Sequence, residues 1–385
     1  MPNRYSDAFV TIDLCSAPPG SMQSNVYEKT GVAGVGTLKI HSAIDSLHTS
    51  TIRCLVTEDP LQHADSLPMW SQDYLQLTPG RFRGRIVEMS CGPVQLFREN
   101  MDQVIDETGY PRASSYTFGV PVTVHQDGYW QAQQVHQDSL LTLMPGEELH
   151  FRTPRVSDIF VTVIDANTLH SHAELILGED VASIATRSQM QTLSASAAAR
   201  YRRVLHEVMC CVQSAPEVLQ HAASSKAVTE SIINASLTAL LSTSEPNKRS
   251  RGGHSIHRAI VERARQYILT NRDIAPSVSD LSIHLKMSRR GLHHAFMNVL
   301  GISPVTFLRY VRLHGARKDL LHGGADASVS CIACKWGFWH LGMFSTYYKA
   351  LFGESPSSTL KNPPQVRPEP WASSIGALPP PDLCA

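Results

Sequence analysis

Alternating apolar and polar positions dominate residues 30–165 and predict a series of short strands. The alternation is clearest at 81–88, 116–120 and 159–163. Four turn-forming dipeptides lie among these runs and predict hairpins: Pro79-Gly80, Gly92-Pro93, Asp127-Gly128 and Pro145-Gly146. Many short strands with turn signals between them favour a small barrel or jelly roll.

The pattern changes to a helical period at residues 188–243. Tyr201, Leu205, Met209 and Val212 fall on one face of a predicted helix, and Pro216 suits the first turn of the next one. One interpretation is that these helices cover the sheet of their own domain. The other is a dimerisation surface, and the two are compatible.

The C-terminal third contains an internal repeat. Residues 277–281 (SVSDL) recur as residues 328–332 (SVSCI), 51 positions later. Apolar and turn positions between 292 and 308 recur between 344 and 360 at an offset of 52, so one residue is inserted where a turn is expected. The repeat indicates two copies of one supersecondary unit.

Each copy is predicted to be a helix, a tight turn and a second helix. Ser277 with Asp280 forms a capping box for the first helix, and Ser288 caps the second. In the second copy the second helix is expected at about 341–351. A linking helix at 304–321 joins the copies, with a basic face that we assign to Arg309, Arg312, Arg317 and Lys318. At about 25 Å it could place the second helices in successive major grooves of DNA.

The charge distribution supports a polyanionic partner for this repeat. The chain has a formal net charge of zero, but residues 1–247 contain 16 Lys and Arg against 26 Asp and Glu. Residues 248–361 contain 17 against 6. A solvated basic surface is the alternative to a nucleic-acid interface. We expect no membrane association, because no apolar run reaches the length of a membrane span.

The eight cysteines follow no disulfide framework, and the N-terminus does not resemble a signal peptide, so we expect a cytoplasmic protein. Cys331 and Cys334 form a CxxC with His322 and His340 nearby. Because the pair falls within a predicted helix, we interpret both as small packing residues instead of metal or redox groups.

Three segments of the repeat region resemble the signature of the AraC/XylS family of bacterial transcription regulators: residues 312–320, 336–345 and 352–356. The resemblance covers about residues 253–362, and by motif it extends to the branch of ethanolamine-operon regulators. It implies a dimeric regulator with an N-terminal cupin-like effector domain. Its expected partners are double-stranded DNA, a second copy of the chain, RNA polymerase and a small-molecule effector.

The family's base-reading positions map onto the second helix of each unit. We expect base contacts from Arg289, Arg290, His293, His294, Gly342, Met343 and Thr346. We expect phosphate contacts from Asn298, Lys349 and His340. The second unit departs from the family pattern, since Met343 and Thr346 stand where a more polar residue is common. Met offers only apolar contact, for example to a thymine methyl group.

The predicted fold is therefore a multidomain α+β protein with five parts. They are an N-terminal extension (1–29), a strand-rich cupin-like barrel (30–187), a helical dimerisation segment with its linker (188–247), an all-α domain with helix-turn-helix units at about 277–300 and 328–352 (248–362), and a disordered Pro-rich tail (363–385). No cofactor or metal is predicted.

The predicted function is a transcription regulator, with activation in response to an effector as the leading interpretation. One alternative is a constitutive regulator whose N-terminal domain only dimerises. The other is an enzyme of the cupin type fused to a DNA-binding domain. The enzyme is disfavoured because His125, His136, His150, Glu147 and Glu148 form no His-x-His metal motif, and common catalytic motifs are missing.

Overall fold

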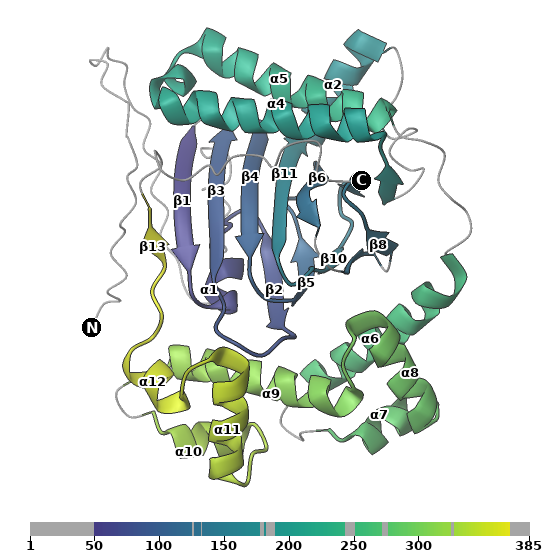
Figure 1. Ribbon diagram of the computed structural model, residues 1–385, viewed down its shortest axis with the longest axis vertical. Coiled ribbons are helices and arrows are strands. Elements are labelled where there is room, and N and C mark those ends of the chain that lie inside the picture. Colours follow the sequence, from purple (N-terminus) through teal and green to yellow (C-terminus); the bar gives the residue numbers. More distant parts are fainter. Residues whose placement is uncertain are drawn as a thin grey trace, which may run out of the picture.

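The structure is a computed structural model that describes residues 50–124, 127–131, 133–177, 181, 189–242, 251–271, 276–324 and 327–369. A strand-rich domain is followed by a helical domain at its lower end (Figure 1). Together they form a mixed α/β protein, as predicted. The N-terminal extension, His125 and most of the linker at 243–250 lie outside the described residues.

The described strands form two antiparallel sheets. The larger has the order β12-β9-β6-β11-β4-β3-β1-β13 and the smaller the order β2-β5-β10-β7-β8. The bounds in the larger sheet are β1 Thr51–Thr57, β3 Gly84–Cys91, β4 Val94–Met101, β6 Ser115–Val124, β9 Ser139–Leu143, β11 Ser157–Asp165, β12 Met190–Thr192 and β13 Arg367–Pro368. Those in the smaller sheet are β2 Ser71–Gln76, β5 Ile105–Tyr110, β7 Gly128–Trp130, β8 Gln133–Val135 and β10 Leu149–Arg152. Within the described residues the sheets keep open edges, so the predicted closed barrel is not confirmed.

Apolar side chains from both sheets form a core between them, which includes Phe97, Trp130, Phe151 and Val161. The opposite face of the larger sheet is covered by the helices α2 Ala166–Leu177, α4 Ala195–Ser214, η2 Pro216–Gln220 and α5 Ala222–Leu241 (Figure 1). Tyr201, Leu205, Met209 and Val212 of α4 are buried there. This confirms that the helical segment covers its own sheet; a role in dimerisation stays a prediction.

Only one of the four predicted hairpins pairs neighbouring strands. Gly92-Pro93 joins β3 to β4, which lie side by side in the larger sheet. The chain at Pro79-Gly80 leaves the smaller sheet for the larger, and Pro145-Gly146 connects β9 to β10 in the other sheet. Asp127-Gly128 begins β7, and the two residues before it lie outside the described residues. A turn dipeptide reverses the chain, but burial of the two facing surfaces decides which sheet the next strand joins.

The helical domain consists of two helix-turn-helix units around a central helix. Its bounds are α6 Arg251–Thr270, α7 Val278–His284, α8 Arg289–Leu300, α9 Pro304–Leu321, α10 Val329–Lys335, α11 Leu341–Phe352 and α12 Pro356–Lys361. The first unit packs Leu292, Phe296 and Phe307 into one core. The second packs Trp336, Phe344 and Tyr348 into another. The central helix α9 contributes to both cores, so the two units share one rigid element.

The first residues of the tail contradict the predicted disorder. Residues 363–369 return from α12 to the strand domain, where β13 pairs with the edge strand β1 (Figure 1). The Glu369 N–H donates to Cys54 O at 2.9 Å, and Arg85 Nη2 lies 2.9 Å from Glu369 Oε2. These contacts satisfy backbone groups that an exposed sheet edge would leave unpaired. Pro-rich composition alone did not reveal that partner.

Every helix in the described ranges is too short or too polar to cross a lipid bilayer.

Candidate nucleic-acid interface and its junction with the strand domain

The first helix-turn-helix unit is fixed by local capping. The Ser277 side chain accepts from the Asp280 N–H, and Asp280 accepts from the Ser277 N–H at 2.8 Å, which completes the predicted capping box. The hydrogen bond from the Ser277 amide, followed by that from its hydroxyl, lowers the pKa of Asp280. Ser288 caps α8 through the Gly291 N–H, and α8 ends at Gly301, whose φ of 69° suits glycine. Both helix starts therefore follow the prediction.

The expected base-reading residues of this unit share one exposed face of α8. Arg290, His293 and His294 are exposed and, together with Met297, line a shallow surface hollow. Arg289 is also exposed, and its Nη2 donates to Ser279 Oγ at 2.6 Å on the preceding helix. An exposed, donor-rich face on the second helix is the arrangement that reads base edges in a major groove.

Asn298, an expected phosphate contact, lies further along α8 and is half-buried. Its Nδ2 lies 3.2 Å from His257 Nδ1 of α6, and His294 packs edge-to-face on the same ring with centroids 5.0 Å apart. Both side chains therefore also brace α8 against α6. The sequence repeat gave no sign of this contact, because α6 lies outside it.

The second unit exposes a different set of groups. Gly342, Met343, Thr346 and Lys349 are all exposed on α11, and His340 is exposed at its N-cap position. His340 makes no capping hydrogen bond through its side chain, unlike Ser288 in the first unit. Thr346 donates its hydroxyl proton to Gly342 O at 2.9 Å within the helix. The face is thus poorer in side-chain donors than that of α8.

The strand domain contacts the C-terminal end of both recognition helices. Arg152 of β10 donates to Val299 O at the end of α8, at 3.3 Å. At the end of α11, the Gly80 N–H donates to Ala350 O, and Gln76 Nε2 donates to Leu351 O at 2.8 Å. The last carbonyl groups of a helix have no partner within it. The strand domain supplies those partners for both helices at once.

Two buried arginines complete the junction. Arg317 of α9, assigned from the sequence to the basic face of the linking helix, is only 1% exposed. Its Nε donates to Asp59 of the strand domain, and its Nη2 lies 2.8 Å from Glu354 Oε1. Burial lowers the pKa of Arg317, but the neighbouring carboxylates outweigh it and raise the pKa above the ordinary value, so the charge is kept. Arg265 of α6 forms a second buried ion pair, with Asp106 of β5, and burial lowers the pKa of Arg265.

A buried histidine lies beside Arg317. His314 Nε2 accepts the Gln76 N–H at 3.0 Å, and burial lowers the pKa of His314 to about 3. Its neutral form is therefore part of the contact between the domains. Gln76 bonds to both His314 and the end of α11, so one strand end connects the central helix with the second unit.

A cleft lies between the strand domain and the first unit, with a volume of about 40 Å³. Burial, followed by the charge of Arg258, lowers the pKa of His150 in its wall to about 4. The lining comes from both domains: Asp106, Thr108, Tyr129, His150, Arg152, Arg258, Val261, Glu262, Arg265, Asn298, Val299 and Leu300. Such a volume holds only a few water molecules.

The junction residues were not predicted from the sequence, because each of them contacts a partner that is far away in the chain. Asp59 and Arg317 are 258 positions apart.

The prediction that Cys331 and Cys334 are packed is wrong, since both are exposed on α10. The described residues contain no group of three or more His, Cys, Asp or Glu side chains placed to hold a metal ion.

Comparison with known proteins agrees with the geometry. A family model described as a helix-turn-helix domain matches residues 281–362. The XylDLEGF operon transcriptional activator 2 of Pseudomonas putida is 34% identical over 124 residues, which cover 32% of this chain and 78% of that protein. The probable thc operon regulatory protein of Rhodococcus erythropolis is 38% identical over 106 residues. That match covers 27% of this chain and 32% of the relative, so the chain matches only about a third of the length of such longer relatives.

Among solved structures, a probable AraC family transcriptional regulator from Rhodopseudomonas palustris shares 34% identity over 27% of this chain and 95% of its own, with a TM-score of 0.26. ToxT from Vibrio cholerae aligns over 81% of this chain and 97% of its own at 11% identity, also with a TM-score of 0.26.

The fold and the exposed helices define a protein with two helix-turn-helix units joined by one helix. With the 34% identity to a relative of which it covers most of the length, the chain belongs to the AraC/XylS family of transcription regulators.

Proposed function

We propose that the chain is a sequence-specific, double-stranded DNA-binding transcription regulator that activates its target genes. The observation that carries this proposal is the pair of exposed recognition helices on the shared helix α9. Its 18 residues give a length of about 27 Å. With the widths of the flanking units, this length suits contact with successive major grooves, which are about 34 Å apart.

In this proposal each unit has a defined set of contacts. Arg289, Arg290, His293 and His294 read bases for the first unit, and Gly342, Met343 and Thr346 do so for the second. Asn298, Lys349 and His340 contact phosphates. The support is their common exposure on α8 and α11, with Asn298 half-buried at the end of its helix.

Substitution of Arg290 tests the base-reading role. We expect Arg290→Ala in the full chain to weaken binding to a selected DNA site by about 1–3 kcal/mol and to relax one base position. Binding to random DNA should change far less. Arg203→Ala removes an exposed charge on α4 and serves as the control. Equal losses on selected and random DNA would contradict the proposed role.

We further propose that the strand domain is a cupin-like effector domain, that α4 and α5 form a dimerisation surface, and that the bound regulator acts on RNA polymerase. The cleft between the domains supports regulation by a change in their contact. Its volume of about 40 Å³ is too small for an effector molecule, so binding there would require the domains to separate. A compound that raises the melting temperature and leaves DNA affinity unchanged would count against this mechanism.

A further inference from the structure

Three large apolar side chains are exposed at the start of the second recognition helix and in the turn just before it. Trp339 is 82% exposed, Leu341 43% and Met343 47%. Gly342 lies between them, and a Cβ at this position would meet nothing within 4 Å. The corresponding turn of α8 exposes Arg289 and Arg290 instead. The two units therefore offer DNA chemically different faces.

Solvent exposure of three such side chains within five residues is unfavourable unless a partner covers them. Trp339, Leu341 and Met343, the apolar cluster, lie within five positions of the chain, whereas the exposed apolar side chains of an ordinary surface are scattered. Polar groups of the same face do little to compensate, because Thr346 has already donated its hydroxyl proton within the helix and Met343 has no proton to donate. The face is therefore suited to apolar contact and poorly suited to hydrogen-bonded base reading.

We propose that the second unit reads DNA by apolar contact, with Met343 and Trp339 packed against the 5-methyl groups of thymines in its half-site. The thymine methyl is the apolar feature that base pairs present in the major groove. This inference rests on the proposed function, and it assigns the second unit a half-site defined by thymines.

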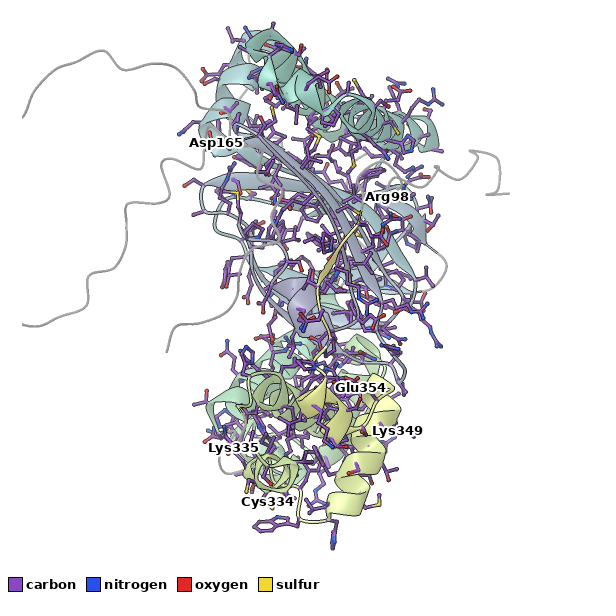
Figure 2. The ribbon with its side chains drawn as sticks, turned by 90° about the vertical axis from the view of Figure 1, so that its left-hand side faces the viewer. Arg98, Asp165, Cys334, Lys335, Lys349 and Glu354 are labelled. Carbon is purple, nitrogen blue, oxygen red and sulfur yellow. The ribbon has the colours of Figure 1, made fainter. Side chains whose placement is uncertain are left out.

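The position of the apolar cluster favours DNA over a protein as its occupant. The C-terminal end of α11 is held by the strand domain, so the cluster occupies the end of the helix that points away from that domain (Figure 1). Figure 2 shows Lys349 on the same unit, and its exposed charge suits a phosphate backbone beside the cluster. Gly342 removes the side chain that would keep the helix backbone away from the bases.

The experiment uses the full chain and a site selected from random DNA. The base position that relaxes in Arg290→Ala locates the half-site of the first unit, and the conserved positions about one helical turn of DNA away form the half-site of the second. Each thymine of the second half-site is then replaced by deoxyuridine, which removes only the methyl group. We expect a loss of about fourfold in affinity for each methyl that is contacted.

The same replacements are measured in Met343→Ala and Trp339→Ala. Both side chains are exposed, so the fold should be retained, and Leu175→Ala on α2 (85% exposed) is the matched control. We expect the variants to bind natural DNA more weakly and to lose their response to deoxyuridine, whereas the control keeps it. Such coupling identifies a direct contact.

Two results would overturn the inference in distinguishable ways. Affinity within twofold of the original after replacement of every thymine in the second half-site, with the Arg290 effect intact, would reject methyl reading and leave the proposed function standing. The cluster would then belong to a protein interface. Failure to select any site, without salt-dependent binding, would reject the proposed function itself.

Discussion

Replacement of Asp59 should measure how strongly the two domains are held together. Asp59 is fully buried; its Oδ2 pairs with Arg317, and its Oδ1 accepts from the backbone N–H groups of Leu61 and Gln62. It therefore has two separable functions, an ion pair between the domains and the N-cap of α1 (Pro60–Ala64). Asn preserves a good N-cap but removes the charge.

The expected loss of stability depends on the partners that Arg317 retains when Asp59 is replaced. Removal of one partner of a buried ion pair generally costs about 3–5 kcal/mol, because the other charge stays buried. Arg317 retains Glu354 and the Tyr348 hydroxyl, so we expect the lower end for Asp59→Asn, about 3 kcal/mol. Asp59→Ala also loses the cap and should cost about 1 kcal/mol more.

Urea unfolding followed by tryptophan fluorescence provides the measurement. Asp65→Asn is the matched control, since Asp65 ends the same short helix and is exposed; we expect a change within about 0.5 kcal/mol. If Asp59→Asn were no more destabilising than this control, the buried pair would not hold the domains together. If Asp59→Ala matched Asp59→Asn, the cap would be unimportant.

Two further predictions concern the same junction. Burial lowers the pKa of His314 from 6.5 to about 3. Between these pH values the unfolded chain therefore binds more protons than the folded one. The free energy of unfolding falls by up to about 1.4 kcal/mol per pH unit as the pH drops through this window. In His314→Gln, which can still accept from Gln76, thermal melting between pH 6 and 4.5 should show a shallower dependence, and an unchanged slope would contradict this reasoning. Truncation after Asn362 removes β13, which pairs with β1. Amide hydrogen exchange should then become faster in β1 but stay unchanged in the central strand β11. Unaltered exchange in β1 would mean that β13 does not protect it.

Local signals explain why the helical domain was predictable from the sequence. The capping box at Ser277, the cap at Ser288 and the glycine at 301 each act within a few residues, and the glycine recurs at 353 in the second unit. α9 accordingly begins at Pro304 and ends at Leu321 as expected. Once the ends of a helix are known, the spacing of its apolar residues predicts which of its faces is buried.

The rest depends on partners that periodicity cannot identify. Arg317 occupies a polar position on α9, and only the approach of Asp59 from another domain makes it a buried residue. Likewise, Pro79-Gly80 predicts a reversal of the chain but not that the next strand joins the other sheet. The exposed helix faces followed from the pattern, whereas the junction that positions them did not.

In the proposed DNA complex, the hydrogen bonds from the strand domain to the ends of α8 and α11 would help to fix the spacing between the two half-sites. The central helix α9 lies between the two helices in the chain, and the strand ends that carry Arg152 and Gln76 bond to their C-terminal ends. Substitutions in those strand ends, remote from any base pair, would then alter which spacings between half-sites are accepted. Operator preference could therefore diverge between related regulators whose reading helices are identical.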